Sequence, residues 1–283
     1  MARGLYKMLD GEPVAIGAVN TILIASADGA IPARLYSPIS DDGASLPGII
    51  YYHGGGFVFG DADCYDNVCR RLANGAGCRV ISVDYRLAPE HPFPAACNDA
   101  IAVARDILSN ARRYGVDPAR IAVAGDSAGG NLAAVTAQAQ RGDSRHPLAL
   151  QILINPTTQL CANTPSMAAF AEGRFLERDD MDWCVSHYLG QAKHLTHDPR
   201  ASPLLATDLA GLPRALVFTA GHDPLRDEGA LYAERLKDAG VETTCVCFEN
   251  LIHNFIVLGA VSPAAHAAIE RVHALVKDAL HDA

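Results

Sequence analysis

Residues 121–132 read IAVAGDSAGGNL, and this stretch decides the fold of the chain. An apolar run leads into a turn of small residues, and an alanine-rich helical stretch follows. Within the turn, the spacing Gly125-x-Ser127-x-Gly129 is typical of a sharp strand-to-helix turn that pushes a serine into a cleft. A Cβ atom at either glycine would collide with the neighbouring strand or helix. The pattern predicts an exposed Ser127 at a helix N-terminus, where free N–H groups and the helix dipole stabilise negative charge.

Strand-like and helix-like segments alternate along the rest of the chain. We predict strands at 79–83, from 121 up to the turn at Gly125, and at 148–155, 214–220 and 242–248. Helices are predicted at 61–76, 95–114, 128–141, 226–239 and from 263 onward. An irregular loop is predicted at 84–94 and a turn at 117–118. Such alternation is typical of a parallel sheet with helices on both faces. Ahead of it, the runs 19–26 and 31–37 flank Asp28-Gly29, which predicts a hairpin, and 48–52 is a further short strand.

One long segment interrupts this alternation. Residues 156–200 carry no predicted strand, hold the only tryptophan and are helical mainly at 179–189. A stretch of this length predicts an inserted subdomain. Together with residues 1–18, we interpret it as a cap on a single domain that spans 1–283. Four aromatic side chains are candidates to line an acyl pocket, with plain packing inside the cap as the equal alternative: Phe57, Phe170, Phe175 and Trp183.

Composition narrows the class of protein. The chain has 283 residues and a formal net charge of −9, which argues against nucleic acid and anionic membrane surfaces as partners. No run approaches the roughly 18 apolar residues that span a bilayer, and the first ten residues lack the apolar run of a secretory signal. We therefore expect a cytoplasmic protein. Its eight cysteines suggest neither a disulfide framework nor a metal site, because no metal-binding spacing accompanies them.

Chemistry at Ser127 requires two further side chains. A serine hydroxyl is a weak nucleophile, so it needs a general base, and histidine serves because its pKa lies near neutrality. A carboxylate must then hold the imidazole tautomer. Asp223 and His253 each follow a predicted strand, which places both at the C-terminal edge of the sheet with Ser127. Asp227 is the competing acid, although its place at a helix start suits a stabilising carboxylate. Two nearby carboxylates are interpreted as structural anchors: Asp126 and Glu228.

The anion formed by nucleophilic attack needs backbone donors. One is predicted to be the N–H of Ala128, and the others to come from the loop after the third strand. That loop reads His53-Gly54-Gly55-Gly56, and three consecutive glycines let the backbone approach a substrate with its N–H groups pointing inward. We interpret His53 as a loop-forming residue that bonds backbone groups, rather than as a second base.

Five motifs occur in one order along nearly the whole chain. They are HGGGF at 53–57, DYRLAPEHPFPA at 84–95, GDSAGG at 125–130, SPLL at 202–205 and DPLRDEG at 223–229. In this combination the sequence resembles the hormone-sensitive-lipase-like branch of the α/β hydrolases, also called family IV bacterial esterases. The resemblance implies an α/β-hydrolase fold, with a mostly parallel twisted sheet, helices on both faces and a helical cap.

The resemblance also implies a function. It predicts hydrolysis of carboxylic esters with short to medium acyl chains, through a Ser-His-Asp triad and an acyl-enzyme intermediate, without a cofactor. By this resemblance Gly55, Gly56 and Ala128 form the oxyanion hole, with Gly54 forming the turn. Separately from the resemblance, Phe57 and Trp183 are the aromatic candidates that we expect to contact the substrate. The expected partner is a small-molecule ester. The oligomeric state is left open, with a homodimer among the options.

Two departures from the family pattern affect these expectations. Only 52 residues precede His53, fewer than is usual in the family, which predicts a reduced cap and a preference for short acyl groups. The usual His-Gly-Phe reads His253-Asn254-Phe255, and Asn250 replaces an expected glycine. Asparagine is the non-glycine residue that best tolerates a positive φ, so we expect the turn to form with some strain.

Two other functions would use the same fold. A deacetylase or amidase acting on acetylated small molecules would need the same site, because only protonation of the leaving group differs. A non-catalytic small-molecule receptor would be expected to lack part of the triad, whereas all three residue types are present here. Turnover of matched ester and amide substrates separates the first alternative, and labelling of Ser127 by an organophosphate separates the second.

Overall fold

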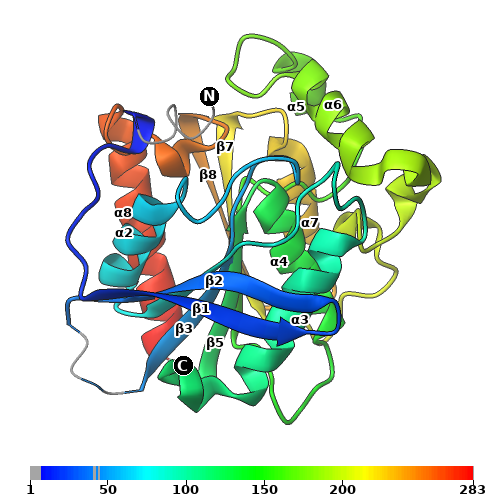
Figure 1. The fold of residues 1–283 in the computed structure, drawn as a ribbon. Coiled ribbons are helices and arrows are strands. Elements are labelled where there is room, and N and C mark those ends of the chain that lie inside the picture. Colours follow the sequence, from blue (N-terminus) through cyan, green and yellow to red (C-terminus); the bar gives the residue numbers. More distant parts are fainter. Residues whose placement is uncertain (1–7, 41–42, 44, 283) are drawn as a thin grey trace.

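The computed structural model describes residues 8–40, 43 and 45–282. Within them, the strands form one sheet in the order β1-β2-β4-β3-β5-β6-β7-β8 (Figure 1). The strands are β1 (Ala18–Ser26), β2 (Gly29–Ser37), β3 (Leu46–Tyr52), β4 (Arg79–Val83), β5 (Val116–Asp126), β6 (Leu150–Ile154), β7 (Arg214–His222) and β8 (Thr243–Ile252). The predicted hairpin joins β1 and β2, whose Ser26 pairs with Gly29, and β2 pairs antiparallel with β4. The remaining pairs are parallel, which confirms the mostly parallel sheet.

Helices cover both faces of the sheet. They are α2 (Asp66–Ala76), α3 (Ala95–Ser109), α4 (Ala128–Ala139), α7 (Arg226–Asp238) and α8 (Pro263–His281). Figure 1 shows α2 and α8 on one face, and α3, α4 and α7 on the other. The buried side chains separate in the same way: Val68 and Val272 belong to the first core, and Val103, Leu132 and Tyr232 to the second. This is the layered arrangement that the alternation predicts.

Strand β5 shows why the central strands read as continuous apolar runs. Ile121 and Val123 belong to the core under α4, whereas Ala122 and Ala124 belong to the core on the opposite face. Successive side chains of a strand point to opposite faces, so a strand covered on both sides must be apolar at every position. The run before the serine therefore has to be a central strand.

Three predicted boundaries are wrong for local reasons. Asp117-Pro118 lies inside β5 rather than in a turn, at a place where the register with β3 shifts and a proline without an N–H is tolerated. The helix predicted from residue 61 begins at Asp66, because the preceding residues form hydrogen-bonded turns. The helix predicted to extend to residue 114 ends at Ser109 and is followed by a separate 3-10 turn.

The segment 156–200 contains α5 (Pro165–Ala169), α6 (Arg178–Leu189) and a 3-10 turn at Gly190–His197. Figure 1 shows α5 and α6 together, beyond the upper end of α4 and α7. This position supports the prediction of a cap there. Of the other predicted cap element, residues 1–7 lie outside the described residues. No helix in the described part of the chain combines the length and the apolar composition that crossing a membrane requires.

Candidate active site

The predicted nucleophile occupies the single position between β5 and α4. Ser127 has φ 52° and ψ −118°, a backbone conformation that non-glycine residues adopt only when surrounding contacts hold it. Its N–H donates to the carbonyl oxygen of Ile154 at the end of β6 (2.9 Å). A Cβ atom at Gly129 would overlap the carbonyl oxygen of Tyr52, so α4 can approach β3 this closely only because Gly129 has no side chain. The sharp strand-to-helix turn is therefore present.

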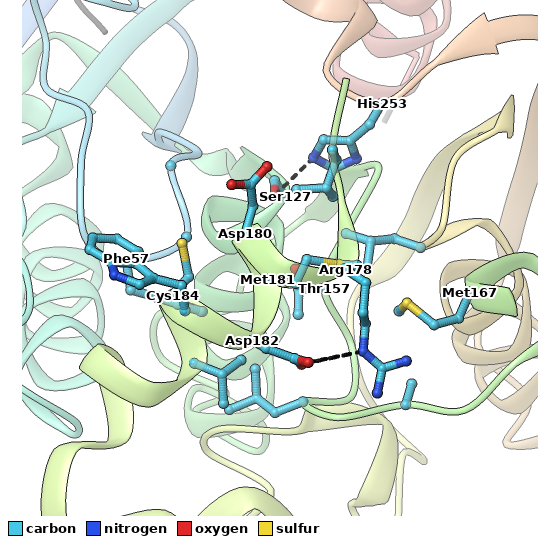
Figure 2. Close-up of a pocket in the computed structure, with 18 of the residues that line it drawn as sticks. Phe57, Ser127, Thr157, Met167, Arg178, Asp180, Met181, Asp182, Cys184 and His253 are labelled. Atoms are coloured by element: carbon cyan, nitrogen blue, oxygen red, sulfur yellow. Dashed lines mark hydrogen bonds and ion pairs between the residues drawn. The ribbon is translucent and has the colours of Figure 1, made fainter. Parts of the chain in front are cut away.

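Three residues predicted to react meet at the C-terminal edge of the sheet. Nε2 of His253 lies 3.1 Å from Oγ of Ser127, and Nδ1 of His253 lies 2.9 Å from Oδ2 of Asp223. Figure 2 shows the contact between Ser127 and His253. Asp223 is fully buried and His253 is 4% exposed, so bulk water competes little with these hydrogen bonds. The arrangement can move a proton from the hydroxyl to the imidazole.

Two further donors hold the Asp223 carboxylate. Asn155 Nδ2 donates to Oδ2 (2.7 Å), and the N–H of Leu225 donates to Oδ1 (2.8 Å). Asp227, the competing acid, instead accepts from the N–H of Ser166 (2.7 Å), which ties α7 to α5. The sequence analysis misses Asn155. The signal that could have identified it is its position, as a polar residue directly after a buried strand at the edge where the site forms.

Asp126 links the elbow to the glycine loop. Its carboxyl group accepts from the hydroxyls of Tyr51 (2.8 Å) and Tyr65 (2.7 Å) and from the N–H of Gly54 (3.1 Å). Burial raises the pKa of Asp126, and the two tyrosine hydrogen bonds oppose that rise. The structural anchor predicted here has a specific task, because it fixes the glycine loop relative to the nucleophile next to it.

Backbone N–H groups suited to an oxyanion come from the glycine loop and the start of α4. Gly55 and Gly56 have φ of 115° and 60°, and both line the cavity that contains Ser127 and His253. Ala128 is the first residue of α4, so its N–H has no acceptor within the helix. Within the described residues, none of these three N–H groups donates a hydrogen bond to the protein. Unpaired N–H groups held by the backbone in this way are suited to bind a developing oxyanion.

His53 lies buried beneath this loop. Its ring stacks on Tyr85 with centroids 4.3 Å apart, and its Nδ1 donates to the carbonyl oxygen of Gly54 (2.7 Å). The hydroxyl of Tyr85 in turn donates to the carbonyl oxygen of His53 (2.7 Å). Burial lowers the pKa of His53, which favours the neutral ring. These contacts match the loop-forming interpretation.

A cavity of about 390 Å³ adjoins the nucleophile, and most of its lining is apolar. Three of the four aromatic candidates line this cavity, namely Phe57, Phe175 and Trp183. Phe170 is not among its lining residues, and its ring instead packs edge-on against His222, with centroids 5.6 Å apart. Three of the four aromatic candidates therefore line the cavity, and Phe170 packs outside it. A cavity of this size and character suits a small ligand.

Glu228 of α7 is a buried carboxyl that lines the same cavity. Its Oε1 accepts from the N–H groups of Thr158 (2.7 Å) and Gln159 (3.1 Å), and its Oε2 has no hydrogen-bond partner within the described residues. Burial raises the pKa of Glu228 from 4.5 to about 8, and the nearby Asp223 carboxylate adds to the rise. The neutral form therefore predominates at neutral pH, where it anchors the loop after β6.

Glu228→Gln is expected to flatten the pH dependence of stability. Because the folded-state pKa of Glu228 lies above its unfolded value, its contribution is fully present below about pH 4.5 and is lost as the pH rises through about 8. Glutamine keeps an acceptor for both N–H groups and cannot ionise. The free energy of unfolding of Glu228→Gln minus that of wild type should therefore increase by on the order of a few kcal/mol between about pH 5 and pH 8.5.

Urea unfolding at several pH values measures this effect. Glu234→Gln, which removes an exposed carboxylate from the same helix, is the matched control and should leave the wild-type pH dependence in place. Parallel stability profiles for wild type and Glu228→Gln would contradict the assignment.

Comparisons with known proteins find esterases. A sequence profile described as "alpha/beta hydrolase fold" matches residues 49–257. Carboxylesterase NlhH of Mycobacterium tuberculosis is 44% identical over 254 residues, which cover 89% of this chain and 79% of that protein. The carboxylesterase EstE1, cloned from a metagenomic library, has a TM-score of 0.93 at 41% identity, with 99% and 95% of the two chains covered. The ester-hydrolase EH1AB1 from the Lake Arreo metagenome has a TM-score of 0.93 at 46% identity, with 97% and 87% covered.

Proposed function

Since the chain belongs to the hormone-sensitive-lipase-like branch of the α/β-hydrolase family, it is a carboxylic-ester hydrolase, and we propose that Ser127, His253 and Asp223 carry out its reaction. The observation that supports this assignment most directly is the hydrogen-bonded chain from the hydroxyl through the imidazole to the carboxylate, with separations of 3.1 and 2.9 Å. The proposed substrates are small-molecule esters with short to medium acyl chains.

In the first half of the proposed reaction, Oγ of Ser127 attacks the carbonyl carbon while Nε2 of His253 takes the hydroxyl proton. The carbonyl oxygen becomes an oxyanion, which accepts hydrogen bonds from the N–H groups of Gly55, Gly56 and Ala128. The intermediate then collapses. The bond to the alcohol oxygen breaks, Nε2 returns its proton to that oxygen, and the acyl group stays on the serine.

In the second half, water attacks the acyl carbon and gives a proton to Nε2 of His253. The bond to Oγ breaks, the proton passes to Oγ, and the carboxylic acid leaves. Asp223 keeps the proton of His253 on Nδ1, so that Nε2 faces the serine as a base, and it stabilises the imidazolium formed in each half. Asn155 is proposed as a positioning residue, because its amide holds the Oδ2 that accepts from Nδ1.

The experiment is a series of p-nitrophenyl esters with acyl chains of increasing length, together with the matching p-nitroanilide. We expect the highest kcat/KM for short to medium acyl groups, because a cavity of about 390 Å³ has limited room for a long chain beside the leaving group. The anilide should react far more slowly. A maximum at long acyl chains would contradict the proposed substrate range, and faster turnover of the anilide would favour the amidase alternative.

The cytoplasmic location stays a prediction. The oligomeric state stays open, with a homodimer among the options. The family assignment makes the chain an enzyme, which disfavours the receptor alternative. Covalent labelling of Ser127 by an organophosphate would test directly whether this serine is a reactive nucleophile.

A further inference from the structure

Among the carboxyl groups that line the cavity, that of Asp180 differs from the others in its surroundings. The charged or imidazole-bearing residues that line the cavity are Asp126, Arg178, Asp180, Asp182, Glu228 and His253. Asp126 and Glu228 are buried and accept the hydrogen bonds given above, and Arg178 pairs with Asp182 (3.2 Å). For Asp180, the described part of the chain shows neither a hydrogen bond nor an ion pair. Among the charged lining residues, Asp180 is therefore the one without a charged or hydrogen-bonding side-chain partner in the described part of the chain, and its side chain is exposed.

Asp180 is positioned toward the reacting end of the cavity. It lies in the first turn of α6. Figure 2 shows its side chain extending from α6 toward the end of the pocket that holds Ser127 and His253, whereas Arg178 and Asp182 pair at the opposite end. Arg178, which is the one arginine or lysine among the described lining residues, is thus turned away from Asp180 and engaged with Asp182. Asp180 therefore adds a negative charge at the end of the cavity that holds the nucleophile.

We propose, on the basis of the function proposed above, that Asp180 is a specificity-determining residue that selects esters carrying a positively charged group, such as an ammonium. It favours them over neutral esters of the same shape and disfavours esters that carry a carboxylate. Opposite charges several ångströms apart attract, and an apolar wall screens that attraction less than bulk water does. Because most of the lining is apolar, few other polar groups compete for the bound cation.

An acidic residue in a first helical turn also stabilises the helix through its dipole. Asp179 allows the two roles to be separated. It lies in the same turn of α6 and carries the same charge, but it is not among the residues that line the cavity. Asp179→Asn therefore repeats the change in net charge and in dipole interaction without altering the pocket.

The experiment compares choline butyrate with 3,3-dimethylbutyl butyrate, which has the same shape with a carbon in place of the quaternary nitrogen. Titration of the released acid at low ionic strength gives kcat/KM for each ester. We expect the cationic-to-neutral ratio to fall by about 3- to 10-fold in Asp180→Asn, the range that a partly exposed charge pair supports. The ratio in Asp179→Asn should stay close to wild type. Asp180→Lys should lower the ratio further, because it repels the cation.

Ionic strength provides a second readout. Raising NaCl from about 10 mM to about 500 mM should reduce the wild-type ratio and leave that of Asp180→Asn nearly constant, since salt screens exposed charges. An unchanged ratio in Asp180→Asn, or an equal fall in Asp179→Asn, would overturn the proposal. Failure of the proposed function looks different, because Ser127→Ala would then hydrolyse the neutral ester at the wild-type rate.

Discussion

Ser127→Ala is expected to lower kcat for p-nitrophenyl butyrate by about 10⁵- to 10⁶-fold, the scale on which a serine nucleophile acts together with its base. The alanine variant retains the cavity and the backbone donors, so KM should change little and some activity above the uncatalysed rate should remain. Within the described residues, Oγ of Ser127 makes a hydrogen bond with His253 and no other, so its removal should leave the fold intact. Loss of rate with unchanged thermal unfolding is therefore the expected result.

The energetic coupling between Ser127 and His253 provides a stricter test of the mechanism. His253→Ala should cost about as much as Ser127→Ala, and the double variant little more, because residues that act as a unit lose their joint contribution only once. Ser144→Ala, which removes an exposed hydroxyl from a loop, is the matched control. Wild-type turnover in Ser127→Ala, or fully additive losses in the double variant, would rule out the proposed mechanism.

Asp223→Asn is expected to lower kcat/KM by about 10⁴-fold at neutral pH. The amide cannot stabilise the imidazolium, and its NH₂ group would donate toward Nδ1 of His253, which favours the tautomer that leaves Nε2 protonated and unable to act as a base. In the wild type, Oδ2 of Asp223 accepts from both Asn155 and His253. The amide of the variant can no longer accept equally well from both of these residues.

Asp227→Asn supplies the control that separates the two candidate acids. It makes the same change four residues later, where the carboxylate accepts from the N–H of Ser166 and pairs with Arg226. We expect kcat/KM to stay within a few-fold of wild type and the free energy of unfolding to fall by about 1 kcal/mol, the usual value of one such hydrogen bond. A larger loss of activity in Asp227→Asn than in Asp223→Asn would assign the acid to Asp227.

Much of the fold could be predicted because its signals are local. A strand covered on both faces has to be apolar throughout, and strand–helix alternation then leaves few ways to pair the strands. One boundary error occurs where the register between two paired strands shifts, and the other two occur where a helix gives way to hydrogen-bonded turns. Pro118 reads as a turn former, yet it is accommodated in β5 where the register with β3 shifts. Residue 114 reads as helical, yet α3 ends at Ser109.

The part of the candidate site that follows from the topology of the sheet was predictable. Ser127 and His253 are 126 positions apart, and both were expected at one edge because the carboxyl ends of parallel strands meet there. Asn254 adopts φ 62°, as expected for an asparagine in place of glycine. Asn155 and the tyrosines that bind Asp126 were missed, since each is an ordinary strand or loop residue until its partner is known.

By itself, the sequence determined the layered sheet, the strand-to-helix turn at Ser127 and the residue types able to react, because apolar periodicity and glycine spacing act over a few neighbouring positions. Only the tertiary structure decided which carboxylate reaches His253, which aromatic rings line the cavity, and that Asp180 lines it without a side-chain partner among the described residues. Those outcomes depend on distances between segments far apart in the chain. They are set by where the segments after β5, β7 and β8 meet the segment that holds α6, and no local pattern records that meeting.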